Sequence, residues 1–150
     1  MITVVQRVSD AKVTVGGEVV GAIGIGLVAL AAIVKGDTDR DLEWTAAKLT
    51  GLRIFRSADG DKHFDRDVRE VGGSILLVSN FTVSAATRQG RRPSLDRAAD
   101  PATAQAMFGR FVDAARAQNV PVHTGRFAVD MQVTLVNDGP ATFILDSTAG

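Results

Sequence analysis

The chain has 150 residues, 45% hydrophobic and 23% charged, which is ordinary for one globular domain with a sizeable core. Lysine plus arginine equals aspartate plus glutamate at 17 each, so the net charge is zero. This balance argues against a protein that grips long stretches of nucleic acid, and DNA is not an expected partner. The absence of cysteine excludes disulfides, thiolate catalysis and cysteine–zinc sites, and it fits a cytoplasmic location.

The first third of the chain is predicted to form strands and then a helix. Apolar β-type runs predict strands at Ile2–Val8, Lys12–Val15, Glu18–Ile23 and Leu27–Val34, with a turn at Gly16-Gly17. The uncharged run 19–34 is broken by glycines and falls short of the roughly 20 residues that a membrane span needs, so no membrane partner is expected. A helix is predicted from Thr38 to Thr50, capped by Asp37 or Thr38, with Trp44 partly exposed.

The rest of the chain is predicted to alternate strands with one further helix. Strands are expected at Leu52–Phe55, Ser74–Val83, Val129–Val136 and Ala141–Leu145. The second helix should begin at Pro101 with Asp100 as its N-cap and end at Asn119. Its apolar stripe comprises Ala104, Met107, Phe108, Phe111, Val112 and Ala115. The pattern predicts an α/β (α+β-like) fold, with residues 1–150 forming a single domain.

Two short polar segments follow strongly apolar strand-like runs. Ser79-Asn80-Phe81-Thr82-Val83 comes after Ile75–Val78, and Asn137-Asp138-Gly139-Pro140-Ala141-Thr142 comes after Val133–Val136. Strand ends present side chains and free backbone N–H groups at rigidly held places, so a site there needs no strong acid or base. The second segment could be a plain hairpin turn, but Gly-Pro also tolerates a cis peptide bond, which would present two carbonyl oxygens side by side.

The histidines give little support to acid–base or metal chemistry. A Ser-His-Asp hydrolase would need His63 or His123 close to Ser79 or Ser94, and the sequence gives no such pairing. Neither histidine belongs to a ligand pattern, so no metal or other cofactor is expected. A generic serine or metal hydrolase nevertheless stays open as a rival hypothesis.

Four arginines cluster in the polar loop between the strand that carries the first motif and the second helix: Arg88, Arg91, Arg92 and Arg97. They are either a solvated charged loop or a small phosphate-binding patch, because guanidinium groups match phosphate oxygens. Arg7, near the end of the first strand, is either a surface charge or a brace for a neighbouring loop.

The two motifs together resemble those of D-aminoacyl-tRNA deacylases, also called D-tyrosyl-tRNA deacylases. That family has Ser-Gln-Phe-Thr-Leu where this chain has residues 79–83, and Asn-x-Gly-Pro-Val-Thr where it has residues 137–142. Further landmarks follow in the family's order: Val5-Gln6-Arg7-Val8, Leu52-Arg53-Ile54-Phe55, Val71-Gly72-Gly73, Arg92-Pro93-Ser94 and Thr124-Gly125-Arg126-Phe127. The resemblance therefore extends over nearly the whole chain.

The resemblance implies a fold, a partner and a reaction. It implies barrel-like packed β-sheets with two main helices outside, a homodimer, and hydrolysis of the ester that joins a D-amino acid to the 3′ end of tRNA, with release of the free D-amino acid. A cis Gly139-Pro140 would enter the partner subunit's active site and reject L-amino acids by steric clash, while glycyl-tRNA would pass. Arg7 would hold the Gly-Pro loop, and Asn137 and Met131 would belong to the substrate-binding set.

The resemblance also implies the catalytic set: Ser79, Asn80, Phe81 and Thr82. Phe81 would offer its backbone N–H to the substrate carbonyl, and the adenosine 2′-hydroxyl would assist the attacking water. Thr82 as a covalent nucleophile is the rival, but no activating base is evident nearby. Asn80 replaces the family glutamine, and Val83 and Ala141 are milder departures. Asn80 leaves open a second interpretation, in which the chain is a non-catalytic module that binds an RNA end or an amino acid.

Overall fold

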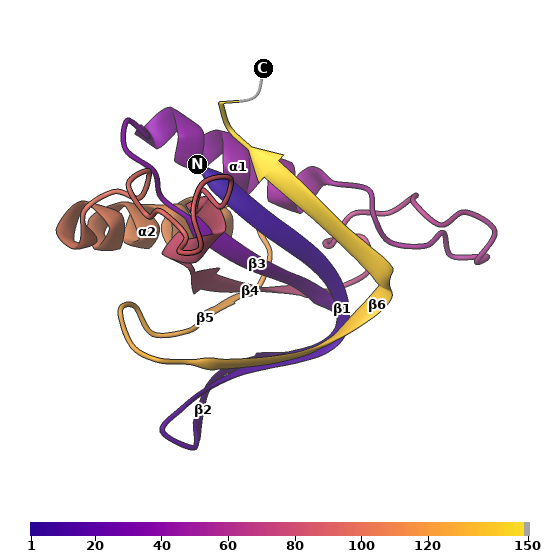
Figure 1. The fold of residues 1–150 in the computed structure, drawn as a ribbon. Helices are drawn as coiled ribbons and strands as arrows, with labels where there is room; N and C mark the ends of the chain where they lie inside the picture. The colour runs from indigo at the N-terminus through magenta and orange to yellow at the C-terminus, as the bar shows by residue number, and fades with distance from the viewer. Residues whose placement is uncertain (149–150) are drawn as a thin grey trace.

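The computed structural model describes residues 1–148, so Ala149 and Gly150 of the predicted domain lie outside the described residues. Six strands, two α-helices and one short 3₁₀ helix, η1, are present in this range (Figure 1). Their bounds in chain order are β1 Ile2–Val15, β2 Glu18–Ile23, β3 Gly26–Ala32, α1 Asp39–Gly51, β4 Ser74–Ser79, η1 Phe81–Ser84, α2 Pro101–Arg116, β5 Val122–Thr124 and β6 Gln132–Asp146.

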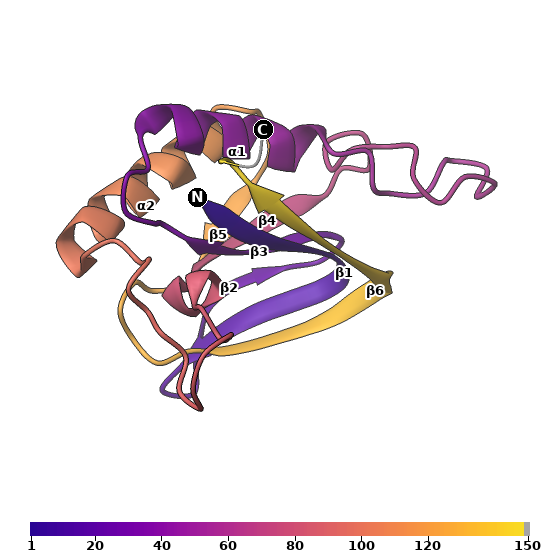
Figure 2. The same ribbon diagram turned by 45° about the horizontal axis from the view of Figure 1, so that its top comes forward.

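All six strands belong to one mixed sheet. Its order is β2-β1-β3-β4-β5, and β6 lies along β1. The pairs that involve β1 are antiparallel, whereas β3, β4 and β5 run parallel to one another. The first half of β1 pairs with β3 and its second half with β2, while β6 follows both halves. The sheet therefore bends sharply along β1 and β6, as Figures 1 and 2 show.

The bend brings β2 against β4 and β5 and makes the sheet barrel-like, as predicted. Gly21 on β2 marks the closest approach, since a Cβ there would lie 2.4 Å from the backbone oxygen of Thr124. Seven buried residues fill the space between the two halves: Val8, Ala11, Val13, Ile23, Val28, Leu76 and Val78. A larger cluster, which includes Leu27, Leu77 and Phe111, lies on the other face beneath the helices.

Both helices lie outside this sheet and begin at the predicted caps (Figure 2). The Thr38 backbone N–H donates to the Asp41 carboxylate at 2.8 Å at the start of α1. At α2, the Asp100 carboxylate accepts a 3.0 Å hydrogen bond from Thr103 N–H, and this bond lowers the pKa of Asp100. Trp44 is 41% exposed, and the predicted stripe of α2 is buried except for Ala104, which is half-buried.

Several predicted boundaries were wrong. Residues 2–8 and 12–15 belong to one continuous strand, β1, and residues 129–136 and 141–145 are joined in β6. The expected strand 52–55 is absent apart from a bridge between Phe55 and Arg66, and the strand expected to reach Val83 ends at Ser79. Helix α2 ends at Arg116, three residues before the predicted end at Asn119, which adopts a positive φ of 58°. Strand β5 was not predicted.

Candidate active site

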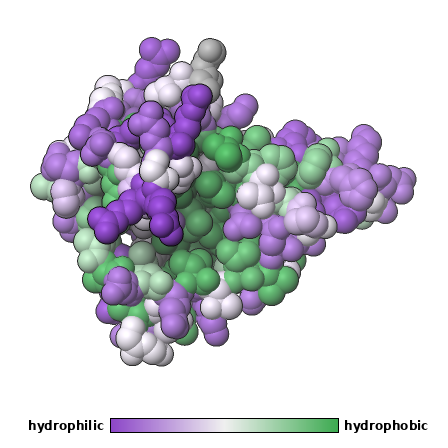
Figure 3. Space-filling model, viewed as in Figure 1, coloured by the Kyte–Doolittle hydropathy of each residue, from purple (hydrophilic) through white to green (hydrophobic). Residues whose placement is uncertain are grey.

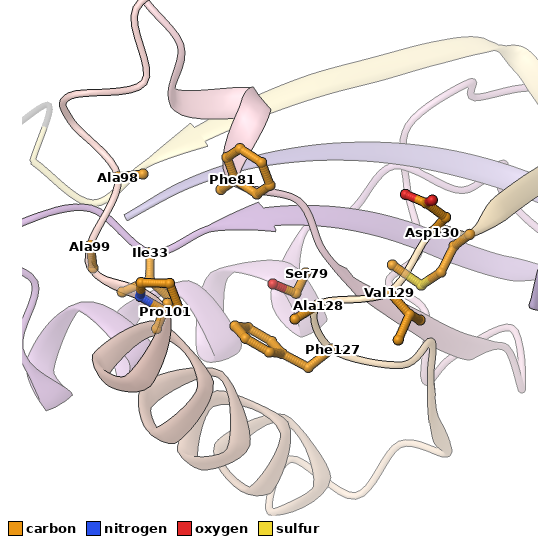
Figure 4. A pocket seen from close by; sticks show the side chains of 12 residues that line it. Ile33, Ser79, Phe81, Ala98, Ala99, Pro101, Phe127, Ala128, Val129 and Asp130 are labelled. Atoms are coloured by element: carbon orange, nitrogen blue, oxygen red, sulfur yellow. The ribbon is translucent and has the colours of Figure 1, made fainter.

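A cavity of about 510 Å³ opens beside the end of β4, the central parallel strand. Its walls come from η1, the start of α2 and the segment before β6 (Figure 4). The lining is mainly apolar and comprises Ile33, Ser79, Phe81, Ala98, Ala99, Pro101, Ala104, Phe127, Ala128, Val129, Asp130 and Met131. A volume of this size admits a small organic group with a ring system.

The first motif turns the chain at this cavity. The backbone N–H of Asn80 donates to Ala31 of β3 at 2.8 Å, which fixes the point where β4 ends. The Asn80 side-chain oxygen then accepts from the Thr82 N–H at 3.2 Å and the Thr82 hydroxyl at 2.5 Å. Asparagine is a strong helix N-cap because its short side chain reaches the second and third backbone N–H groups. Asn80 therefore caps η1 and holds it against the cavity.

The cap leaves the backbone N–H of Phe81 available. Within residues 1–148, this N–H has no hydrogen-bond acceptor, whereas those of Asn80, Thr82 and Val83 are all satisfied. A free N–H at the start of a helical turn attracts a partial negative charge. The side chain of Phe81, 55% exposed, lies on the cavity wall opposite Phe127 (Figure 4). The motif can therefore donate a backbone hydrogen bond to a carbonyl oxygen bound in the cavity.

The second motif forms a wide bulge in the middle of β6. Gln6 pairs with Thr142 and Val8 pairs with Asn137, so one β1 residue, Arg7, faces the four β6 residues 138–141. Asn137 closes the bulge: its amide nitrogen donates to the backbone oxygens of Arg7 and Ala141, both at 3.0 Å. Gly139 and Pro140 project from it, exposed and joined by a cis peptide bond. We call these two residues the elbow.

Arg7 braces the elbow from inside the protein. Its side chain is 3% exposed, and its Nε donates to the backbone oxygen of Asp138 at 2.8 Å and lies 3.2 Å from the Asp138 carboxylate. One terminal nitrogen donates to the backbone oxygen of Ile54 at 2.6 Å. A buried guanidinium held by several oxygens is a rigid anchor. Arg7 and Asn137 together fix where the elbow points.

The two motifs lie at opposite ends of the sheet within one chain. Ser79 pairs with Ala31 on β3, whereas Arg7 pairs with Leu27, four residues away on the same strand. At 3.3 Å per residue, the Ser79–Ala31 pair and the Arg7–Leu27 pair lie about 13 Å apart along β3. No elbow residue lines the cavity. The elbow of one chain therefore lies away from the cavity of that chain.

The structure divides the predicted site residues into two groups, except for Thr82, which is hydrogen-bonded to Asn80 but lines neither the cavity nor the hollow beside it. Ser79, Phe81 and Met131 line the cavity, and Asn80 lines an adjoining hollow of about 450 Å³ that shares those three residues. Arg7, Asn137, Gly139 and Pro140 form the separate elbow region. Sequence reasoning missed the apolar walls at 98–99 and 127–129, although the Thr124–Phe127 landmark pointed to one of them.

Neither histidine lies at this site. The Nδ1 atom of His63 is 2.8 Å from a terminal nitrogen of Arg56 in an exposed loop, and His123 is exposed on β5. In the part of the chain that the structure describes, no three His, Cys, Asp or Glu residues are grouped to hold a metal ion. The same residues contain no helix long and apolar enough to cross a membrane.

The curved mixed sheet, the outer helices and the cavity at the end of β4 define a barrel-like α/β fold with a candidate enzyme site. Residues 4–146 match the family model described as D-Tyr-tRNA(Tyr) deacylase. The chain belongs to this family.

Relatives agree with the family assignment, and solved structures share the fold. The chain is 52% identical over 147 residues to a D-aminoacyl-tRNA deacylase of Geobacter sulfurreducens, covering 98% of this chain and 95% of the relative. One from Desulfitobacterium hafniense is 50% identical, with 98% and 97% covered. A structure titled c-Myc DNA Unwinding Element Binding Protein superposes with a TM-score of 0.94 at 38% identity, covering 99% and 100%. A probable eukaryotic D-amino acid tRNA deacylase shares the fold, with a TM-score of 0.81 at 16% identity and 96% and 97% covered.

Proposed function

We propose that this protein hydrolyses the ester bond of D-aminoacyl-tRNA and releases the free D-amino acid and tRNA. The observation that carries the proposal is the backbone N–H of Phe81, just beyond β4, which has no acceptor within residues 1–148 and belongs to a residue that lines a cavity without histidine. An aminoacyl ester is already labile, so a protein that polarises its carbonyl needs no strong base. The names of the relatives at about 50% identity point to the same substrate.

In the proposed reaction, negative charge develops on the substrate carbonyl oxygen that accepts a hydrogen bond from the Phe81 N–H. Water attacks the carbonyl carbon, the carbonyl oxygen becomes an oxyanion, and the bond to the ribose oxygen breaks as that oxygen takes up a proton. The Phe81 N–H stabilises the oxyanion, and the neighbouring 2′-hydroxyl of the terminal adenosine orients the water. Thr82 supports this geometry without attacking, because its hydroxyl proton is already donated to Asn80, an amide oxygen that is not a base.

Selection between D- and L-amino acids is assigned to the elbow of a second copy of the chain. Supporting this, the elbow is exposed and lies about 13 Å along the strands from the row of its own Ser79. Among the described residues, β6 pairs with β1 alone, and it exposes Val133, Val136 and Ile144, at 37%, 55% and 71%. Such a face favours association with another copy. Figure 3 shows hydrophobic side chains gathered around a hollow on this side of the molecule.

The rigid backbone of the elbow would lie against one side of the Cα atom of the substrate's amino acid. That side then has room for a hydrogen atom and not for a side chain. The Arg7 and Asn137 hydrogen bonds supply this rigidity. L-aminoacyl esters are then refused by clash, whereas glycyl esters pass because glycine has no side chain.

The test is to incubate the purified protein with D-tyrosyl-tRNA, L-tyrosyl-tRNA and glycyl-tRNA and to follow ester loss. We expect rapid loss of the D-ester, slower loss of the glycyl ester and an intact L-ester. If the protein binds the RNA but leaves the D-ester intact, the proposal is wrong and the chain is a non-catalytic binding module. An intact glycyl ester at high enzyme concentration would contradict selection by exclusion.

A further inference from the structure

The loop between η1 and α2 holds a concentration of positive charge that the proposed chemistry does not use. Residues 85–99, which we call the basic arm, contain four arginines and one aspartate, Asp96, for a net charge of +3. The whole chain has a net charge of zero, so the remaining residues together have −3. An excess of one sign confined to a single loop creates a local field in an otherwise neutral molecule.

The basic arm is a defined hairpin anchored to the sheet. Ala86 and Ser94 exchange two backbone hydrogen bonds of 2.9 Å, so Arg88, Arg91 and Arg92 lie in the loop that this pair closes. The returning segment is fixed at the end of β3, where Lys35 N–H donates to the Arg97 oxygen at 2.9 Å and Ala99 N–H donates to the Ile33 oxygen at 3.1 Å. The arginines are thus presented at a fixed place, with Lys35 adding a further charge beside Arg97.

Arg88, Arg91 and Arg92 have no carboxylate partner within residues 1–148, whereas Arg97 lies near Asp146 and adds to the Thr148 hydrogen bonds that lower the pKa of that carboxyl. Among the described residues, no ion pair includes any of these four arginines, and all four are exposed. Six other arginines do have carboxylate partners: Arg7, Arg53, Arg69, Arg110, Arg116 and Arg126. The one acidic residue of the arm, Asp96, accepts a 2.8 Å hydrogen bond from the Ser94 hydroxyl. The arm therefore presents guanidinium groups that are free to bind an external anion.

The C-terminal end of the basic arm belongs to the wall of the cavity, and so does Phe81, which precedes the arm in the sequence. Ala98 and Ala99 at the end of the arm line the cavity directly. In Figure 3, strongly hydrophilic side chains gather next to a hollow lined by hydrophobic ones, on the side where Figure 1 shows this loop. A molecule whose end occupies the cavity therefore continues past the arm as it leaves.

We propose that the basic arm binds the phosphodiester backbone of the tRNA acceptor end, directly beyond the nucleotide that enters the cavity. This inference rests on the proposed function and names a further contact of the same substrate. Every nucleotide before the terminal adenosine contributes one phosphate, and guanidinium forks bind phosphate oxygens without reading sequence. The arm positions the RNA and supplies affinity, while the cavity and elbow recognise the aminoacyl group.

The test compares two variants with the same loss of charge. One carries Arg88→Gln, Arg91→Gln and Arg92→Gln; the matched control carries Lys48→Gln, Arg53→Gln and Arg116→Gln, all exposed and outside the arm and the cavity lining. Two substrates are used, D-tyrosyl-tRNA and the 3′-ester of D-tyrosine with adenosine, which has no phosphate. Binding of uncharged tRNA is measured in parallel by fluorescence anisotropy.

We expect the arm variant to lose roughly tenfold in kcat/KM on D-tyrosyl-tRNA through a higher KM, and to keep wild-type kcat/KM on the adenosine ester. The slope of log Kd for uncharged tRNA against log salt should fall by about 2, since each phosphate contact to a single strand contributes about 0.7. The control variant should behave as wild type.

An arm variant with wild-type KM and salt slope would overturn the proposal. An equal loss of kcat/KM on both esters would also overturn it, because the arm would then act through the cavity. If wild-type protein leaves both esters intact, the proposed function fails. The uncharged-tRNA measurement still decides the arm in that case: a binding loss confined to the arm variant supports it, and unchanged binding overturns it.

Discussion

At the scale of single residues, the account depends on one backbone hydrogen-bond donor. Phe81 contributes an N–H group and an aromatic wall, and these two contributions can be separated by substitution. Phe81→Ala removes the ring and keeps the N–H, whereas Phe81→Pro removes both. Proline is tolerated at the first position of a helical turn, which is where residue 81 lies. We expect kcat for Phe81→Pro to be about 10²–10³ below that of Phe81→Ala, the usual effect of losing one oxyanion donor.

The comparison is made by single-turnover hydrolysis of D-tyrosyl-tRNA, with thermal melting to show that both variants fold alike. Equal rates for the two folded variants would contradict a role for this N–H.

The hydroxyl of Thr82 gives a second test at this scale. It donates to Asn80 at 2.5 Å and so supports the η1 turn. Replacing it with Thr82→Val removes one hydrogen bond, worth about 1 kcal/mol, and we expect a loss in kcat of no more than roughly tenfold. Rapid-quench kinetics should show no burst and no acyl-enzyme. Complete loss of activity in a folded Thr82→Val protein would instead identify Thr82 as the nucleophile.

At the scale of elements, the start of α1 is tied to the end of β6 by a carboxylate. Asp41 accepts hydrogen bonds from the Ser147 hydroxyl at 2.7 Å and from Thr38, and these hold its pKa down at about 2. A depressed carboxyl pKa gives stability that is present above the unfolded value of 3.8 and lost as the pH falls toward 2. Ser147→Ala should remove part of this stability near neutral pH.

Urea denaturation at several pH values checks this linkage. The free energies of unfolding of wild type and Ser147→Ala should differ at pH 6 and converge near pH 2. Ser9→Ala, which removes an exposed hydroxyl on β1, is the control and should leave the pH dependence unchanged. A gap between wild type and Ser147→Ala that is constant from pH 6 to pH 2 would show that Asp41 is not responsible.

The closure of the sheet between β2 and β5 is also testable. A Cβ at Gly21 would lie 2.4 Å from the Thr124 backbone oxygen, whereas a Cβ at Gly24 would have no atom within 4 Å. We expect Gly21→Ala to lower the free energy of unfolding by about 1–3 kcal/mol through overpacking. Gly24→Ala should stay within about 0.5 kcal/mol of wild type in the same urea titration. Equal stability of the two variants would show that β2 does not pack closely on β5.

Local signals predicted the elements that depend on local structure. Asp100 and Pro101 mark the start of α2 because capping and a fixed proline φ act within one turn. Strand β5 is three residues long and is defined by its pairing with β4, so no local sequence pattern predicts it. Residues 52–55 have strand composition, but Ile54 and Phe55 are apolar because they are buried in the core, not because they form a strand.

The candidate site likewise has parts that local sequence signals predict and parts that they do not. The first motif was predictable because an apolar run stops at polar residues, but the end of β4 was expected at Val83, and only the structure shows that Asn80 turns the chain after Ser79. The cavity walls at Ala98 and Val129 were not predictable, since small apolar residues in loops look alike whether or not they line a site. The separation of elbow and cavity follows from the register in which the strands pair, and this register could not be predicted from the sequence.

At the scale of the whole molecule, the account requires two copies of the chain. A buried anchor, Arg7, holds the elbow at one end of the sheet, and the cavity with the free Phe81 N–H lies at the other. We therefore propose that the elbow that serves a cavity comes from a neighbouring molecule. The exposed apolar residues of β6 flank the elbow on both sides along the strand, so one surface would bring the copies together and position the elbow.

Complementation between two inactive or unselective variants tests this claim most directly. Phe81→Pro disables a cavity and keeps the elbow; Gly139→Val disables the elbow, because φ at Gly139 is +153° and a Cβ would lie 2.4 Å from Ala141 N. The variants are given different tags, mixed and purified as heterodimers, and hydrolysis of D- and L-tyrosyl-tRNA is measured. The account predicts that the heterodimer regains D-selective hydrolysis, since the intact cavity receives the intact elbow. A heterodimer that performs no better than the two parent variants would contradict it.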